Sequence, residues 1–263
     1  MGTRIMEHPI LGEPKKGKLV HFTYDGQKLQ GYEGEPIAAA LKAAGIMIHR
    51  YTKMALKPIH DLSPIKRIIV STYQAVSGAG KEGIDELRDE TEAYLKGEEM
   101  QPKILPSKSL PKHYPIAFNL IPQIDKFVEK DYTKEEMKMV NETHKMLHDD
   151  SIAITATTVR VPVFRSHAES VYVETADELT VDAVRKAIDA FPGAQVQDNP
   201  AEMEYPMPLF TSEKYDCYVG RIRKDLYNPK AINLWVSGDQ IRKGAALNAL
   251  QIAEYMLAHD MIH

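Results

Sequence analysis

Residues 66–80 read Lys66-Arg-Ile-Ile-Val-Ser-Thr-Tyr-Gln-Ala-Val-Ser-Gly-Ala-Gly80. The first part of this stretch is rich in β-branched and aromatic side chains, and its apolar run is typical of a strand buried in a sheet. The small residues from Ser77 to Gly80 predict a tight turn, and the sequence after them predicts a helix at about 81–96. A buried strand that passes through such a turn into a helix indicates a fold built around a central sheet.

Longer elements follow this strand along the chain. Pro-rich sequence at 102–122 predicts an irregular connection, and Thr133-Lys-Glu-Glu136 is a capping box that opens a helix to about His148. The remaining expected elements are strands at 151–164, 169–175, 216–223 and 231–237, and helices at 180–191 and 242–259. Strands separated by helices in this way predict an α+β, or mixed α/β, fold with one large mixed sheet.

The first part of the chain has a different pattern. Two alternating stretches at 19–24 and 28–32 flank Asp25-Gly26, which is a strong signal for a β-hairpin. An Ala-rich helix is expected at 37–44, with Gly45 as its stop. We therefore expect a short β-hairpin–helix fragment before the larger domain.

Composition excludes several classes of protein. The 263 residues include 33 basic and 37 acidic side chains, a difference of −4, which argues against a dedicated nucleic-acid partner. No apolar run is long enough to cross a membrane and no signal-peptide stretch opens the chain, so we expect a cytoplasmic protein without a membrane partner. The single cysteine, Cys217, excludes an internal disulfide and a four-thiolate metal site, and its apolar neighbours indicate a buried structural residue.

The turn at 78–83 fits the pattern G-x-G-x-x-G. Two interpretations are open: a dinucleotide-binding loop, whose backbone N–H groups meet a pyrophosphate, or a tight turn that needs small residues. The helix at 81–96 leads into the Pro-rich connection rather than into a second strand, which favours the simple turn.

Several polar side chains could carry chemistry. His167 lies between two expected strands and is either a general base or a surface histidine in a turn. Arg160 offers a planar fork suited to a carboxylate or phosphate. Glu135 and Lys138 lie three residues apart on the first turns of a capped helix, either as a site or as an exposed ion pair. The pair His144 and His148 has metal-ligand spacing but no third ligand in sequence, so we expect no metal site.

Eight segments stand in the same order as in one enzyme family: Met54-Ala-Leu-Lys-Pro-Ile-His-Asp61, Val70-Ser-Thr-Tyr-Gln-Ala-Val-Ser-Gly-Ala-Gly80, Ile121-Pro-Gln-Ile-Asp125, Thr133-Lys-Glu-Glu-Met-Lys138, Val159-Arg-Val-Pro-Val163, Glu169-Ser-Val-Tyr172, Val219-Gly-Arg-Ile-Arg223 and Ile241-Arg-Lys-Gly-Ala-Ala-Leu-Asn248. Together with His167 they resemble aspartate-semialdehyde dehydrogenase, over about four-fifths of the chain. The resemblance implies the catalytic and dimerisation half of that family, with a fold related to the C-terminal domain of glyceraldehyde-3-phosphate dehydrogenase.

The same resemblance implies an activity and a set of partners. The family interconverts aspartate semialdehyde and aspartyl phosphate with NADP and phosphate, in the synthesis of lysine, threonine and methionine. A cysteine thiolate attacks the aldehyde, hydride passes to the nicotinamide, and phosphate cleaves the thioester. The expected partners are therefore a small-molecule substrate, phosphate and a second copy of the chain in a homodimer.

Site residues follow from the resemblance position by position. It implies that His167 is the acid–base residue and Gln74 the active-site glutamine. By the same matching, the expected substrate-binding residues are Arg160 and Glu135, the phosphate-binding residue is Lys138, and the cofactor-contacting residues are Ser77, Gly78 and Gln240.

The chain departs from the family in one respect that concerns the chemistry. The family's nucleophile lies in an Asn-Cys-Ser/Thr motif just before the segment that starts here at Met54, whereas residues 46–53 read Ile46-Met-Ile-His-Arg-Tyr-Thr-Lys53, without a cysteine. We also expect no complete nucleotide-binding domain in the residues printed before it. We therefore expect little or no aspartate-semialdehyde dehydrogenase activity. The alternatives are a non-catalytic dimerisation or binding module, or a relative similar to malonyl-CoA reductase.

The upstream segment resembles a different family. The residues His21-Phe-Thr-Tyr-Asp-Gly-Gln-Lys-Leu-Gln-Gly-Tyr-Glu-Gly-Glu35 and Ala38-Ala-Ala-Leu-Lys-Ala-Ala-Gly45 look like the start of a ferredoxin-like [2Fe–2S] domain of amine and amino-acid dehydrogenase small subunits. The cysteine motif of that domain does not follow, so we expect no iron–sulfur cluster. The two resemblances predict a truncated ferredoxin-like fragment at 1–53 and a semialdehyde dehydrogenase domain at 54–263.

Overall fold

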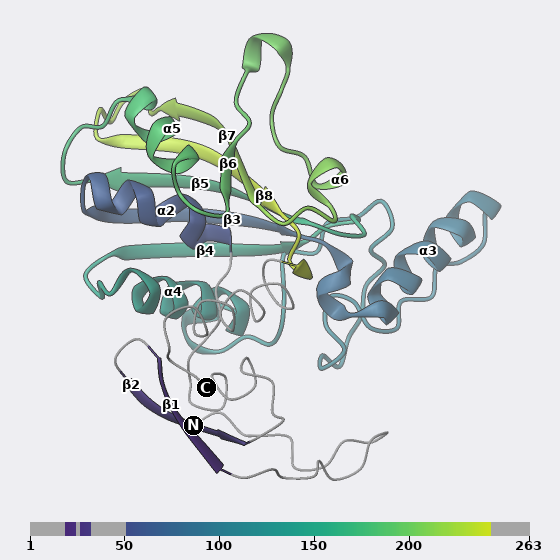
Figure 1. Ribbon diagram of the computed structural model, residues 1–263. Coiled ribbons are helices and arrows are strands. Elements are labelled where there is room, and N and C mark those ends of the chain that lie inside the picture. Colours follow the sequence, from purple (N-terminus) through teal and green to yellow (C-terminus); the bar gives the residue numbers. More distant parts are fainter. Residues whose placement is uncertain (1–18, 25–26, 33–50, 243–263) are drawn as a thin grey trace. The chain divides into compact units, whose positions relative to one another are not determined.

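The computed structural model describes residues 19–24, 27–32 and 51–242 (Figure 1). The chain divides into two compact units, residues 1–49 with 244–263 and residues 50–243. The predicted helix at 37–44, and the predicted helix at 242–259 apart from its first residue, lie outside the described residues.

The first unit contains a two-stranded hairpin. Strands β1 (Leu19–Tyr24) and β2 (Gln27–Tyr32) pair antiparallel, with Tyr24 opposite Gln27 and Leu19 opposite Tyr32. The pairing confirms the hairpin predicted from Asp25-Gly26, because a two-residue connection of this composition matches the twist of antiparallel strands.

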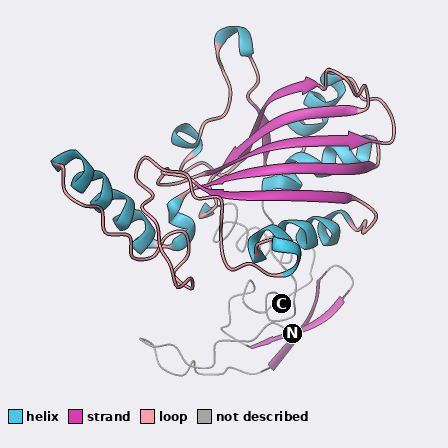
Figure 2. Cartoon of the chain, turned by 180° about the vertical axis from the view of Figure 1, so that it is seen from behind, coloured by secondary structure: helices cyan, strands magenta, loops and turns pink. Residues whose placement is uncertain are grey.

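The second unit is built on a mixed sheet. Its six strands have the order β4-β3-β5-β8-β7-β6, and Figure 2 shows them as one twisted layer. Their bounds are β3 (Ile65–Gln74), β4 (Ala153–Arg160), β5 (His167–Thr175), β6 (Ala194–Val196), β7 (Cys217–Lys224) and β8 (Ala231–Gly238). β3 pairs parallel with β4 and antiparallel with β5, so the carboxyl ends of β3 and β4 meet the start of β5.

Three helices cover one face of this sheet. They are α2 (Tyr51–Leu62), α4 (Lys134–Leu147) and α5 (Val181–Asp189), and both views show them on the same side (Figures 1 and 2). Leu56 and Ile59 of α2 are fully buried with Ile68, Ile188 and Leu234 in the core between the layers. Apolar burial of this kind is the main term that stabilises the unit. Among the described helices, none is both long and apolar enough to span a membrane.

A helical arm extends from the end of β3. The 3₁₀ turn η1 (Val76–Ala79) leads into α3 (Lys81–Lys96), which stands away from the sheet in Figure 1. A smaller core holds the arm together, with Leu87 of α3 against Leu105, Ile116 and Ile121 of the Pro-rich connection. The buried carboxylate of Glu86 accepts backbone N–H bonds from residues 103–105 at 2.8–3.0 Å. Short 3₁₀ turns and helices, η2 (Glu129–Asp131), η3 (Pro200–Glu202) and α6 (Pro208–Thr211), complete the unit.

The structure confirms the mixed sheet and corrects several boundaries. The strand predicted at 151–164 ends at Arg160, because Pro162 lacks an N–H and Ser166 takes a left-handed φ of 70°. The strand predicted at 169–175 begins two residues earlier, so His167 is its first residue rather than part of a loop. Helix α2 and the short strand β6 were not predicted. The strand after α3 is β4, which starts only at Ala153, so the helix does not close a compact βαβ nucleotide-binding unit.

The start of α4 is fixed by the predicted capping box. Thr133 Oγ1 accepts from Glu136 N at 3.2 Å, and Glu136 Oε2 accepts from Thr133 N at 2.7 Å. The other carboxylate oxygen, Oε1, accepts from Thr158 N of β4 at 3.0 Å. Because Glu136 is buried, it anchors the helix to the sheet as well as capping it.

We predict that Glu136→Ala lowers the free energy of unfolding by about 2–4 kcal/mol, because two buried N–H groups lose their acceptor. Urea denaturation at neutral pH measures the change. Glu129→Ala, at an exposed position in η2, is the control and should change the same quantity by less than about 0.5 kcal/mol. Equal effects of the two substitutions would contradict the anchoring role.

Candidate active site

Three predicted site residues meet at one end of the sheet because of strand register. Gln74 at the end of β3 lies beside Arg160 at the end of β4. Tyr73 lies opposite Ala168, so His167, the residue before Ala168, adjoins the same end of β3. Parallel pairing on one side of β3 and antiparallel pairing on the other thus bring two strand ends and one strand start together.

The backbone of Ala75, directly after β3, holds both His167 and Arg160. Its N–H donates to His167 Nδ1 at 3.0 Å, and its carbonyl accepts from Arg160 Nη1 at 2.8 Å. Arg160 Nη2 also donates to the carbonyl of Pro106, at 3.2 Å. Both side chains are largely buried, with 3% of Arg160 and 9% of His167 exposed. The imidazole and the guanidinium are therefore fixed before any ligand binds.

Gly78 lies where these two side chains converge. A Cβ atom built at Gly78 would lie 2.9 Å from Arg160 Nη1 and 3.7 Å from His167 Nε2. The hydrogen bond from Ala75 occupies Nδ1 as an acceptor, so the neutral imidazole carries its proton on Nε2, the nitrogen that faces Gly78. Glycine at this position leaves space beside the groups that can exchange a proton and bind an anion.

The first turns of α4 contribute two further predicted site residues, Glu135 and Lys138. Gln74 Nε2 donates to Thr72 Oγ1 at 3.2 Å and to Glu135 Oε1 at 3.4 Å. Lys138 Nζ lies 3.6 Å from Glu135 Oε2 and 4.0 Å from Glu142 Oε1. The structure therefore places Glu135 and Lys138 next to Gln74, so they are part of the same end of the sheet and not an isolated ion pair.

The remaining predicted residues join the site from the other side of the turn. Gln240 Nε2 donates to Ser77 Oγ, and Gln240 Oε1 accepts from Ser166 N at 3.1 Å. Ser166 precedes His167, so Gln240 links the turn at Ser77 to the start of β5. All eight residues predicted from the sequence thus lie at one end of the sheet.

The sequence analysis missed a buried acid beside this site. Asp239 has no exposed surface and forms an ion pair with Arg165 Nε at 2.6 Å. It also accepts from the backbone N–H of Glu213 at 2.7 Å and of Ile241 at 2.9 Å. These bonds fix the segment that carries Gln240. An acid directly after a buried strand and before a predicted site residue was the signal available in the sequence.

Cys217 lies outside the reach of His167. It is the first residue of β7 and is fully buried, as predicted. His167 pairs with Gly238, and Tyr218 pairs with Ser237, so Cys217 lies two strands away from His167. Two strand spacings amount to roughly 10 Å, far beyond a hydrogen bond.

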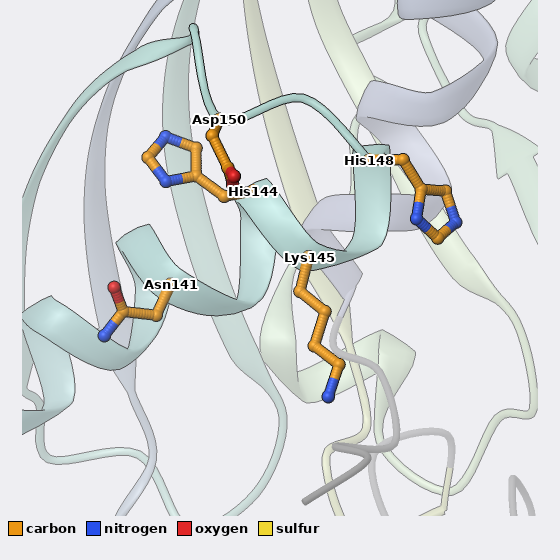
Figure 3. A pocket seen from close by; sticks show the side chains of 5 residues that line it. All are labelled: Asn141, His144, Lys145, His148 and Asp150. Carbon is orange, nitrogen blue, oxygen red and sulfur yellow. The ribbon is translucent and has the colours of Figure 1, made fainter. Parts of the chain in front are cut away.

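The two histidines at the end of α4 are a separate feature. His144 and His148 line a cavity with Asn141, Lys145 and Asp150, and Figure 3 shows the two imidazoles leaving the helix in different directions. His144 Nε2 lies 2.8 Å from the carbonyl of Ile152, a contact that requires a proton on that nitrogen. Within the described residues, no group of three or more His, Cys, Asp or Glu side chains could hold a metal ion.

Comparison with known proteins identifies the family of the domain that carries this site. The family model for the semialdehyde dehydrogenase dimerisation domain matches residues 56–243. The chain therefore belongs to the semialdehyde dehydrogenase family through this domain. A model for the 2Fe-2S iron-sulfur cluster binding domain matches residues 17–62, which supports the second resemblance seen in the sequence.

The similar proteins are aspartate-semialdehyde dehydrogenases. The chain is 50% identical to that of Bacillus subtilis over 209 residues, which cover 79% of this chain and 60% of the relative. It is 48% identical to that of Aquifex aeolicus, covering 80% of this chain and 60% of the relative. The chain thus spans about 60% of the length of these relatives.

Solved structures agree with the predicted fold class. Aspartate semialdehyde dehydrogenase II from Vibrio cholerae has a TM-score of 0.73 and 44% identity, over 79% of this chain and 59% of that one. A Pseudomonas aeruginosa protein described as a "probable aspartate-semialdehyde dehydrogenase" has a TM-score of 0.70 at 27% identity, over 78% of this chain and 59% of that one. These similarities confirm the large mixed sheet with the fold of the semialdehyde dehydrogenase catalytic and dimerisation half.

We predict that neutral His167 is protonated on Nε2 and not on Nδ1, because Ala75 N–H occupies Nδ1. Two-bond ¹⁵N–¹H correlation spectra of the imidazole, recorded on the full chain above neutral pH, distinguish the two tautomers. The exposed His148 serves as an internal reference in the same spectra. A proton on Nδ1 of His167 would show that the Ala75 hydrogen bond is absent in solution.

We predict that Gly78→Ala costs about 1–3 kcal/mol in the free energy of unfolding, because the new methyl group crowds a guanidinium held by two carbonyls. In an Arg160→Ala background the same substitution should cost less than about 0.5 kcal/mol, because the crowded group is gone. Urea denaturation of the four proteins of this cycle measures the coupling. Additive effects would contradict the close approach of Gly78 and Arg160.

Proposed function

We propose that this chain retains the substrate-binding and acid–base part of an aspartate-semialdehyde dehydrogenase but turns over little or no substrate. The family catalyses the NADP-dependent interconversion of aspartate semialdehyde and aspartyl phosphate. Two observations support the proposal. The backbone of Ala75 forms hydrogen bonds with both His167 and Arg160. The one thiol of the chain, that of Cys217, is buried two strands away from His167.

The proposed roles follow from the position of each group. Arg160 binds the substrate carboxylate through its guanidinium fork, and Glu135 orients the substrate from the capped helix. Lys138 supplies a compact positive charge for phosphate. His167 exchanges a proton through Nε2, on the side of Gly78. Gln74 donates to Glu135 and is the register partner of Arg160, so it lies between the helix start and the strand ends.

The turn after β3 fits the edge of a nicotinamide site. At Gly78 the absence of a Cβ leaves the backbone open beside Arg160 and His167, and Ser77 and Gln240 form one wall through their hydrogen bond. These residues would hold the nicotinamide end of NADP, which supplies a hydride acceptor when bound. The buried carboxylate of Asp239, paired with the partly exposed Arg165 and bonded to Ile241 N, keeps Gln240 in place.

The missing nucleophile sets the expected rate. In covalent catalysis the thiolate forms the bond to substrate that the later steps need. Loss of the thiolate therefore lowers the catalytic rate by several orders of magnitude. Residues 46–53, where the family has its cysteine, contain none. Cys217 cannot replace it, because it is fully buried and roughly 10 Å from His167 by strand spacing.

We also propose a division into a ferredoxin-like fragment at 1–53 and a dehydrogenase domain at 54–263. Support comes from the dimerisation-domain model, which matches residues 56–243, and from Ala55 and Leu56 of α2, which are buried in the sheet core. The 2Fe-2S model matches residues 17–62 and so extends across this boundary. We propose that the first part carries no iron–sulfur cluster, because one cysteine cannot supply four thiolates. Bound iron with visible cluster absorbance in the purified chain would contradict this.

Binding and turnover can be measured separately on the full chain. We expect NADP- and phosphate-dependent oxidation of aspartate semialdehyde to be at least about 10⁴-fold slower than in a cysteine-containing relative. Titration calorimetry with aspartate semialdehyde should still show binding, and Arg160→Ala should weaken it at least tenfold. Arg67→Ala, exposed on β3, is the matched control and should bind as the unmodified chain does.

Each measurement has its own contrary result. Turnover comparable to the relative would contradict the loss of catalysis. Binding that does not depend on Arg160 would contradict the carboxylate site, whatever the rate.

We further propose that the chain forms a homodimer, because the matched family model is a dimerisation domain. Size-exclusion chromatography with light scattering should give twice the chain mass of 29.7 kDa. A strictly monomeric chain at micromolar concentration would contradict this proposal.

A further inference from the structure

One fully buried acid, Asp239, ties together three loops beside the candidate active site. Its Oδ2 lies 2.6 Å from Arg165 Nε and accepts from Glu213 N at 2.7 Å. Its Oδ1 accepts from Ile241 N at 2.9 Å and from Arg242 N at 3.2 Å. Both oxygens are thus used, and their donors come from the segment before β5, the segment after α6 and the turn after β8.

Two routes lead from Asp239 to His167. Along the first, Asp239 pairs with Arg165, which stands two residues before His167. Along the second, Asp239 fixes the turn that carries Gln240. Gln240 Oε1 in turn accepts from the N–H of Ser166, the residue directly before His167. The two residues that precede the imidazole along the chain are therefore each bound to the turn after β8.

The backbone of Ser166 explains why the start of β5 needs such support. Ser166 has a left-handed φ of 70°, a conformation that a serine keeps only where its surroundings hold it. The residue is fully buried, its N–H donates to Gln240, and its Oγ accepts from Ser212 Oγ at 3.2 Å. Without these bonds Ser166 can relax to an ordinary φ. That relaxation would turn the next residue, His167, away from the N–H of Ala75.

We propose that Asp239 is a positioning residue for His167. It holds the start of β5, through Arg165 and Gln240, where the imidazole Nδ1 meets the N–H of Ala75. The carboxylate of Asp239 is fully buried, so it acts through these neighbours and not on a ligand. This inference rests on the proposed role of His167 in proton exchange, because the bond at Nδ1 keeps the exchangeable proton on Nε2.

A second buried acid provides a matched control. Asp198 has a fully buried side chain and accepts from Arg185 at 2.7 and 2.9 Å. It also accepts from the N–H groups of Arg221 at 2.7 Å and Ile222 at 3.2 Å. Asp198 therefore resembles Asp239 in bonding to one arginine and to backbone N–H groups. These partners of Asp198 belong to α5 and β7 and not to the start of β5.

Two-bond ¹⁵N–¹H correlation spectra of the full chain, recorded above neutral pH, measure the tautomer of His167 in each variant. We expect Asp239→Asn to raise the fraction of neutral His167 protonated on Nδ1 at least about threefold, because the imidazole loses its alignment with Ala75 N–H. Asp198→Asn should change this fraction less than about 1.5-fold, although urea denaturation should show that both substitutions lower stability.

Contrary results are equally specific. An unchanged His167 tautomer in folded Asp239→Asn would reject the positioning role, and so would an equal change in Asp198→Asn. If Asp239→Asn does not fold, Arg165→Gln decides, because the Arg165 side chain is partly exposed. It should raise the Nδ1 fraction at least about twofold, and no change would reject the proposal.

The spectra also separate this inference from the proposed function. The tautomer is recorded without substrate, so it does not depend on whether the chain binds aspartate semialdehyde. A tautomer that responds to Asp239→Asn in a chain that binds no aspartate semialdehyde would support the positioning role and contradict the proposed function.

Discussion

The candidate site depends on one residue's backbone. Ala75 donates its N–H to the imidazole of His167 and accepts with its carbonyl from the guanidinium of Arg160. Because both groups of one backbone residue are used, a shift of the turn after β3 would move the imidazole and the guanidinium together. The hydrogen bond between Gln240 and Ser77 holds this turn in place. The absence of a Cβ at Gly78 allows the turn to lie close to the Arg160 guanidinium. Such fixed donors and acceptors are what binding and proton transfer need, since they need not reorganise when a ligand arrives.

The mixed topology of the sheet explains why these groups meet. A parallel neighbour brings Arg160 to the end of β3, and an antiparallel neighbour brings His167 there. The capping box of α4 adds Glu135 and Lys138, because Glu136 ties the first turn of that helix to β4. The hydrogen bonds of His167, Arg160 and Gln74 in this framework run to backbone groups and to Thr72 and Glu135.

Local patterns predicted much of this structure. β-branched sequence predicted β3, and the Thr133–Glu136 spacing predicted the start of α4, because strands and caps depend on nearby residues. The sequence around His167 and Arg160 marked them only as candidates, and their expected roles came from family resemblance. What could not be predicted are contacts between distant, irregular segments, such as Arg160 with Pro106 and Arg165 with Asp239. The end of β4 was also missed, because apolar residues continue past Pro162. The helix α2 was missed, although its apolar side chains are buried in the core.

We propose that a binding and proton-transfer site persists in this chain without covalent catalysis. Intact-mass spectrometry of the full chain, incubated with aspartate semialdehyde and NADP in the absence of phosphate, tests it most directly, because an acyl thioester accumulates when nothing cleaves it. We expect an unchanged mass for this chain under conditions in which a cysteine-containing relative gains the acyl group. An acyl adduct on Cys217 would show instead that covalent catalysis persists.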